Sequence, residues 1–249
     1  MEGANIRARA EDILNSIKND MELIPPDFKQ WWSNYLNTHY TRYIYTILLL
    51  EQCEQSGKIL EIGCLPGHLI ILLKLLGHDV HGVDIAPNRA NLLWEKYNVN
   101  IEKVDIEQDS LPFPAETFDT VLFVEILEHL RLNPLHALRE AHRVLKINGR
   151  IIVSTPNITL RHRIDFLKGR SYQGNPVEEF KKLERIGHMG HIRLYTSEEV
   201  KRFLEHSGFT ICFTSYSGQI PGRLVKLVLA LLHKKGHFHK YLHVVAKRV

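Results

Sequence analysis

The chain has 249 residues and a formal net charge of +4, with 44 % hydrophobic and 24 % charged residues. This length suits one large domain or one domain with added segments, and the composition excludes a wholly disordered chain, a collagen and a polytopic membrane protein. The three cysteines, Cys53, Cys64 and Cys212, are too few and too scattered for a disulfide framework or a CxxC metal site. No apolar signal-peptide core is visible near Met1, so we expect a cytoplasmic protein.

The charge is distributed unevenly along the chain. Residues 1–205 carry 25 Lys and Arg against 28 Asp and Glu, whereas residues 206–249 carry seven basic residues and no acidic one. Such an asymmetry occurs in proteins that contact nucleic acid or a membrane surface. Nucleic acid is the disfavoured partner, because no RNA-binding module is recognisable and the basic residues are interleaved with leucines rather than aromatics.

Residues 1–56 are predicted to form an N-terminal helical layer. Apolar residues recur at helical spacing from Ile6 to Met21, and Pro25-Pro26 interrupts the run. An aromatic-rich stretch follows from residue 31 to 45. Two interpretations of this stretch stay open. In the first, the stretch contacts a substrate through Tyr40, Arg42 and Tyr43. In the second, which is favoured for most of its residues, the stretch only packs the helical layer onto a sheet.

From residue 57 the pattern alternates between short apolar runs and helical segments. This alternation predicts an α/β fold with a Rossmann-like, doubly wound parallel sheet. Ligands of such sheets bind at the carboxyl ends of the strands. The predicted strands are 58–63, 79–84, 99–105, 118–125, 150–156, 209–217 and 241–249, and the predicted helices are 68–77, 88–97, 134–146 and 196–208.

Two segments interrupt the alternation. Residues 157–190 are irregular and basic, which predicts a lid-like insertion. Residues 218–240 form an apolar and basic insertion between the last two strands. Within it, 222–236 is too short to span a bilayer, which takes about 20 apolar residues. The favoured alternatives are that this segment packs on its own domain or forms a homodimer contact. The third alternative is a peripheral contact with a membrane surface.

A glycine loop carries the first chemical signal. Glu61 stands near the end of the first strand, and Gly63 and Gly67 let a backbone approach a ligand before the next helix begins. The next two strands end in Asp84 and Asp105. Acids at three consecutive strand ends suggest a ligand with a ribose and an amine-bearing base. A nicotinamide cofactor is disfavoured, because its loop requires GxGxxG.

These segments resemble the motifs of the class I S-adenosylmethionine-dependent methyltransferases. LEIGCLPG resembles their first motif, HGVDIAP their second, VDIEQDSLPFPAETFD their third, and FDTVLFVEILEHL and LREAHRVLKINGRIIVSTPN their fourth and fifth. The resemblance implies S-adenosylmethionine as cofactor and a seven-stranded sheet with an antiparallel last strand. It also implies that 57–249 is the methyltransferase domain.

The resemblance also implies residue roles. Glu61 faces the methionine amine, Asp84 holds the ribose hydroxyls and Asp105 receives the adenine amino group. Leu65 stands where the family usually has glycine, and its side chain is expected to crowd the cofactor. The full set of implied cofactor-binding residues is Glu61, Gly63, Cys64, Gly67, Asp84, Ile85, Asp105, Ile106 and Glu125.

Glu125, Glu128 and His129 form an ExxEH pattern after the fourth sheet strand. On a helical turn these three side chains share one face. Two chemistries stay open: His129, beside Glu128, acts as general base for the acceptor, or a divalent cation lowers the acceptor's pKa. The pattern resembles the metal site of the small-RNA 2′-O-methyltransferases and the ubiquinone-pathway O-methyltransferases, in which a further histidine follows the fifth strand. His191 stands in that place, and Glu125, Glu128, His129 and His191 would suit Mg²⁺ or Mn²⁺. The metal-free interpretation is favoured.

The sequence thus predicts an S-adenosylmethionine-dependent methyltransferase. O-methylation of a small-molecule or lipid-linked acceptor is the first hypothesis, and the ExxEH pattern alone carries the preference for oxygen. The alternatives are an RNA 2′-O-methyltransferase with a divalent metal and a non-catalytic S-adenosylmethionine-binding protein.

Overall fold

A computed structural model describes residues 2–53, 57–170, 190–218 and 239–249, together with residues 175, 177, 178, 180, 181 and 184. The apolar segment 222–236 lies outside these residues, and so does most of the predicted insertion 218–240. In the part of the chain that the structure describes, no helix combines the length and the apolar character needed to cross a membrane.

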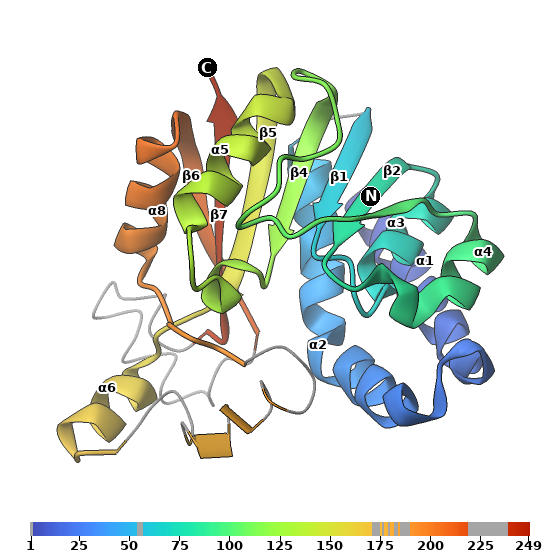
Figure 1. Cartoon of the computed structure of the whole chain (residues 1–249), viewed down its shortest axis with the longest axis horizontal. Helices are drawn as coiled ribbons and strands as arrows, with labels where there is room; N and C mark the ends of the chain where they lie inside the picture. The colour runs from blue at the N-terminus through green and yellow to red at the C-terminus, as the bar shows by residue number, and fades with distance from the viewer. Residues whose placement is uncertain are drawn as a thin grey trace.

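The core of the molecule is one seven-stranded sheet with strand order β3-β2-β1-β4-β5-β7-β6. The first five strands in this order run parallel, and β7 lies antiparallel between β5 and β6 (Figure 1). This arrangement confirms the predicted fold class. The strands are β1 (Lys58–Ile62), β2 (Asp79–Asp84), β3 (Ile101–Lys103), β4 (Phe118–Val124), β5 (Leu145–Pro156), β6 (Phe209–Ser217) and β7 (Tyr241–Arg248).

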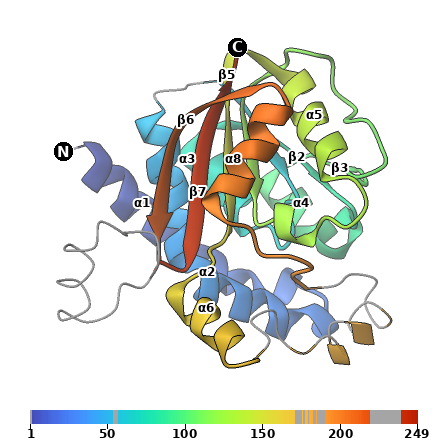
Figure 2. The same cartoon turned by 90° about the vertical axis from the view of Figure 1, so that its left-hand side faces the viewer.

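Helices cover both faces of the sheet, which explains why its central strands are apolar on both sides. On one face, α1, α2 and α3 share a single apolar core with Ile59, Leu122 and Ile152 of the sheet. On the other face, α5 and α8 pack on Leu60, Val121 and other alternate residues (Figure 2). Beyond the N-terminal helices, the segments are α3 (His68–Leu76), the 3-10 turn η2 (Pro87–Ala90), α4 (Asn91–Tyr97), the 3-10 turn η3 (Leu127–His129), α5 (Pro134–Val144), α6 (Leu160–Leu167) and α8 (Ser197–His206).

The N-terminal layer is helical as predicted, with α1 (Glu2–Ile17), a 3-10 segment η1 (Lys18–Leu23) and α2 (Pro26–Gln52). Polar contacts fasten it to the rest of the molecule at several places, two of which lie near the glycine loop and α4. The Trp32 indole N–H donates to the carbonyl of Pro66 in the glycine loop at 3.0 Å. Asp20, which is buried, accepts hydrogen bonds from Lys96 and Tyr97 of α4. The layer is therefore tied to the segments at the carboxyl ends of β1 and β2.

Several predicted boundaries differ from the structure by a few residues, and two of these differences have a clear cause. Helix α5 ends at Val144 rather than at residue 146, because Leu145 already pairs with Phe118 and opens β5. The chain then passes through Asn148, which has a positive φ of 64°, before the ladder resumes at Arg150. Strand β3 is shorter than predicted, because the N–H of Val99 closes α4 on the carbonyl of Trp94.

The predicted lid-like insertion 157–190 is more regular at its start than the sequence suggests. Helix α6 covers 160–167, and its N-cap Thr159 is part of a capping box with His162. Figure 1 shows α6 at one extremity of the molecule, beyond the carboxyl ends of the parallel strands.

Candidate functional site

The glycine loop folds as it does because two of its backbone positions have positive φ. Gly63 has φ 75° and Gly67 has φ 100°, a region that side chains rarely tolerate. Space is also restricted: a Cβ on Gly63 would lie 2.0 Å from Cδ1 of Ile126. The thiol of Cys64 is buried and lies within hydrogen-bond distance of two carbonyls, those of Glu61 (3.2 Å) and Val83 (3.3 Å), between which its single proton is shared.

Asp84 lies at the end of β2 and holds the same loop. Its carboxylate accepts the backbone N–H of Leu65 at 2.9 Å and that of Ala86 at 2.9 Å. The next residue, Ile85, is 57 % exposed. It leaves a bulky apolar side chain at the carboxyl ends of the parallel strands, which we call the rim of the sheet. Together they place a fixed carboxylate beside an apolar surface.

Asp105 follows β3 and organises its own turn. Its carboxylate accepts the N–H of Glu107 at 3.1 Å and the amide of Gln108 at 2.6 Å. Ile106 is 9 % exposed and packs in the core under α5 and α8. Glu107 in turn accepts the backbone N–H groups of residues 131–133, all on Oε1 at 2.6–2.9 Å, which joins this turn to the loop after His129.

Arg42 of α2 enters the site from the N-terminal layer. Its side chain is 2 % exposed and pairs with Oε2 of Glu125 at 3.0 Å. One Nη donates to the Tyr35 hydroxyl at 3.2 Å, and the guanidinium lies 5.4–5.5 Å from the ring centroids of Tyr35, Tyr43 and Tyr241. The sequence left open whether Arg42 contacts a substrate, and it did not reveal this ion pair. A lone arginine amid aromatic residues at helical spacing was the available signal.

The buried charges of the rim do not balance. Glu61, Asp84, Glu125 and Glu128 are all buried, and Arg42 is the only buried Lys or Arg among the described residues. Burial raises the pKa of Glu61, Glu125 and Glu128, and the nearby acids Asp84 and Glu125 raise the pKa of Glu61 and Glu128 further. A ligand that brings positive charge would relieve this excess of acid.

Three of these buried side chains carry atoms without a hydrogen-bond partner. They are Oε2 of Glu61, Oε1 of Glu128 and Nε of Arg42. Buried polar atoms of native proteins are nearly always paired. The two acceptors and one donor therefore mark positions where a polar ligand or an ion would be bound.

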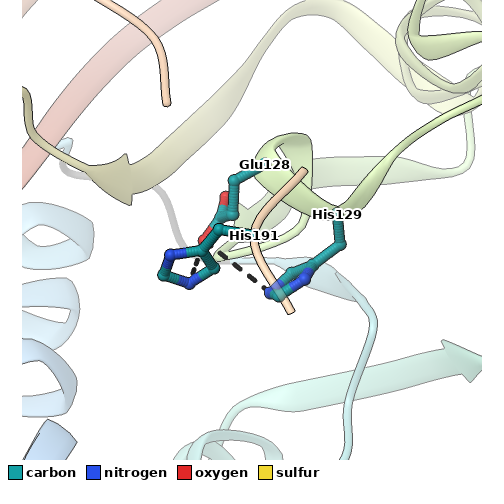
Figure 3. A group of neighbouring side chains, drawn as sticks. All are labelled: Glu128, His129 and His191. Carbon is teal, nitrogen blue, oxygen red and sulfur yellow. Dashed lines mark ion pairs between the residues drawn. The ribbon is translucent and has the colours of Figure 1, made fainter. Parts of the chain in front are cut away.

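Glu128, His129 and His191 form the second cluster (Figure 3). Oε1 of Glu128 lies 4.0 Å from Nε2 of each histidine, and the two imidazole centroids are 5.1 Å apart. Thr155 of β5 donates to the other carboxylate oxygen at 2.9 Å. Nδ1 of His129 lies 3.0 Å from the carbonyl of Gly190, which can only accept, so Nδ1 carries the proton there.

Glu125 lies outside this cluster, contrary to the expectation that the ExxEH side chains share one helical face. The turn is a 3-10 segment that begins only at Leu127, and Glu125 precedes it with a φ of 57°. Its carboxylate faces Arg42 and also accepts from Ser154 at 3.1 Å. Of the four residues predicted as metal ligands, the structure therefore brings three together.

Several known proteins are similar to this chain. A family model described as a methyltransferase domain matches residues 34–212. An uncharacterized protein of Methanocaldococcus jannaschii is 28 % identical, covering 84 % of this chain and 83 % of that protein. The ubiquinone biosynthesis O-methyltransferase of Pseudomonas aeruginosa (strain UCBPP-PA14) is 28 % identical over 65 % of this chain and 74 % of its own. With other curated relatives the match spans about half of their length, 42–57 %.

Among solved structures, a Thermotoga maritima protein described as an S-adenosylmethionine-dependent methyltransferase and possible histamine N-methyltransferase has a TM-score of 0.60. It is 19 % identical, over 90 % of this chain and 97 % of that one. At this identity the match concerns the fold alone.

Proposed function

Because the chain belongs to the class I S-adenosylmethionine-dependent methyltransferase family, we propose that it methylates an oxygen of a small-molecule or lipid-linked acceptor. The family predicted from the sequence is confirmed, and so is methyl transfer from S-adenosylmethionine as the reaction class. The acceptor and the oxygen are the proposal. The cluster of Glu128, His129 and His191 is the observation that supports it.

The rim fits the amino-acid end of S-adenosylmethionine. That end carries an ammonium and a carboxylate, next to a sulfonium. The unpartnered oxygen of Glu61 would accept from the ammonium, and the unpartnered Nε of Arg42 would donate to the carboxylate. Glu125 would hold Arg42 in place. The cofactor's net positive charge would relieve the acid excess of the rim.

The nucleoside end fits Asp84 and Ile85. The Asp84 carboxylate accepts the backbone N–H groups of Leu65 and Ala86, which fixes its position, and it would also accept from the ribose hydroxyls. The exposed side chain of Ile85 would pack on the adenine ring. Asp105 would receive the adenine amino group, as the resemblance implies. Its carboxylate already orders the turn of residues 105–108.

His129 is the proposed general base. Bound S-adenosylmethionine supplies a methyl carbon that the sulfonium makes electrophilic. An acceptor hydroxyl aligned with this carbon would form the new O–C bond as the C–S bond breaks, with S-adenosylhomocysteine as the leaving group. Nε2 of His129 would take the hydroxyl proton, because Nδ1 already donates to Gly190. Glu128 lies behind both histidines and would stabilise the resulting imidazolium.

A divalent cation is the second possibility at this cluster. One carboxylate oxygen and two imidazole nitrogens within 4.8 Å of one another suit Mg²⁺ or Mn²⁺. The 4.0 Å spacings would have to contract by roughly 1 Å, because ligands at about 2.1 Å from one ion lie about 3 Å apart. Such an ion would lower the pKa of the acceptor hydroxyl directly.

Calorimetry with S-adenosylmethionine and its demethylated product tests the cofactor site. We expect both to bind, and we expect Glu61→Gln to weaken S-adenosylmethionine on the order of tenfold through the lost charged hydrogen bond. Glu102→Gln, an exposed acid of β3, is the matched control and should bind normally. If neither compound binds wild type, the proposed function is wrong.

A panel of phenolic, quinol and RNA acceptors, assayed with EDTA and then with Mg²⁺ or Mn²⁺, tests the chemistry. Phenolic and quinol compounds come first because several relatives are named ubiquinone biosynthesis O-methyltransferases. A methylation rate that EDTA does not change supports His129 as general base. A rate that EDTA lowers and the metal ion restores supports a bound divalent cation. The homodimer and the membrane contact through 222–236 stay predictions from the sequence.

A further inference from the structure

Helix α6 and the residues after it carry a large share of the exposed apolar surface. Twelve large apolar side chains are exposed among the described residues, and five of them fall between residues 164 and 180. Such residues are normally scattered singly over a protein surface, and a concentration marks a contact site. The five are Ile164 (40 % exposed), Phe166 (67 %), Leu167 (83 %), Val177 (57 %) and Phe180 (57 %).

The apolar surface continues toward the rim of the sheet. Phe166 and Leu167 line a cavity of about 330 Å³ together with Ile158, His162 and Arg163. Ile158 lies three residues beyond Thr155, the residue that holds Glu128. At about 3.3 Å for each extended residue, the cavity begins roughly 10 Å of backbone from the Glu128 cluster.

Basic residues flank the exposed apolar side chains of α6. Arg163, Lys168 and Arg170 are exposed on α6 and just after it, and Asp165 is the only acid between residues 160 and 170. Bulky apolar side chains beside arginine and lysine match the boundary of an anionic bilayer, where the former enter the acyl region and the latter meet the headgroups. A position at the extremity of the molecule leaves α6 accessible to a flat surface (Figure 1).

We propose that α6 docks the protein on a bilayer that contains anionic lipid. Phe166 and Leu167 insert below the headgroups, and Arg163, Lys168 and Arg170 contact lipid phosphates. This contact involves other residues than the one predicted for 222–236. If the proposed function also holds, docking through α6 would bring a membrane-borne acceptor close to the rim.

Vesicle sedimentation of the full chain tests the docking. Wild type should bind vesicles of phosphatidylcholine and phosphatidylglycerol (3:1), bind pure phosphatidylcholine far less, and be released by 0.5 M salt. Phe166→Ser/Leu167→Ser should lower the partition coefficient by roughly tenfold or more. Arg163→Gln/Arg170→Gln should lower it by about fivefold for each charge removed.

Two control variants change the same residue types elsewhere. Leu92→Ser alters an exposed leucine of α4, and Arg139→Gln alters an exposed arginine of α5. Both should bind vesicles as wild type does, and circular dichroism should give all variants the same thermal midpoint, because the altered side chains are exposed.

Two results would overturn the inference. One is a wild-type chain that does not bind anionic vesicles at low salt. The other is equal binding by wild type and Phe166→Ser/Leu167→Ser, which would place the contact outside α6. Neither of these two vesicle-binding results depends on methyl transfer. A chain that binds vesicles but not S-adenosylmethionine would refute the proposed function and leave the docking intact.

Discussion

Arg42→Met removes the one described cation that is buried among the acids of the rim. Methionine keeps most of the side chain's length and its contacts with the rings of Tyr35, Tyr43 and Tyr241. Glu125, however, loses its partner at 3.0 Å, and its own burial prevents water from replacing that partner. Breaking a buried ion pair from one side costs about 3–5 kcal/mol, so we expect the free energy of unfolding to fall by about that amount at pH 8.

The loss should depend on pH in a defined direction. Burial already raises the pKa of Glu125, and Arg42 is the main group that lowers it, so Arg42→Met should raise that pKa further. A carboxyl whose folded pKa exceeds its unfolded value stabilises the fold below the unfolded pKa and loses this contribution as pH rises through the folded pKa. The destabilisation should therefore be greatest near pH 8 and should shrink toward pH 5.

Urea unfolding at pH 5, 6, 7 and 8 measures this effect. Wild type, Arg42→Met, Glu125→Gln and the double variant form a cycle, and the double variant should recover about 2 kcal/mol relative to the sum of the single changes. Arg7→Met removes an exposed pair with Glu11 and should cost under about 0.5 kcal/mol at every pH. A cost for Arg42→Met below about 1 kcal/mol at pH 8, or one that does not vary with pH, would refute this reasoning.

Two further predictions concern the loops around the site. Glu107→Gln should lower stability by about 2 kcal/mol and speed hydrogen exchange at residues 131–133, because one charged oxygen accepts all three amides; unchanged exchange would contradict this. Gly82→Ala should cost about 1–3 kcal/mol in urea unfolding, because a Cβ there would lie 2.4 Å from the buried sulfur of Cys64. A cost near zero would mean that the loop shifts freely.

Local patterns were sufficient to predict most of the sheet. Strands β1, β2 and β4 begin and end within one residue of their predictions, because each is a buried apolar run followed by a turn. The boundary between α5 and β5 was not predicted, since Leu145 leaves the helix only because Phe118 pairs with it. The position of β7 came from the family resemblance, as periodicity does not reveal which strands are neighbours.

The site was predictable where it depends on neighbouring residues. Gly63 and Gly67, which the sequence singled out in the loop after β1, have positive φ angles that explain why glycine stands there. The pair of Arg42 and Glu125 joins residues 83 positions apart and depends on how α2 packs, which no local pattern encodes. The positive φ of Glu125 was equally hidden, because a glutamate normally avoids that region.

The place of β7 between β5 and β6 has a consequence for the order in which the protein matures. Thr155, which holds Glu128, lies opposite Leu242, 87 residues later in the chain. At about 5–20 residues per second, a ribosome needs roughly 4–17 seconds to supply that partner strand. During this interval the cofactor loop already exists, whereas β5 presents an unpaired edge. The nascent chain therefore contains β1 to β4 and the glycine loop for several seconds before β5 can pair with β7.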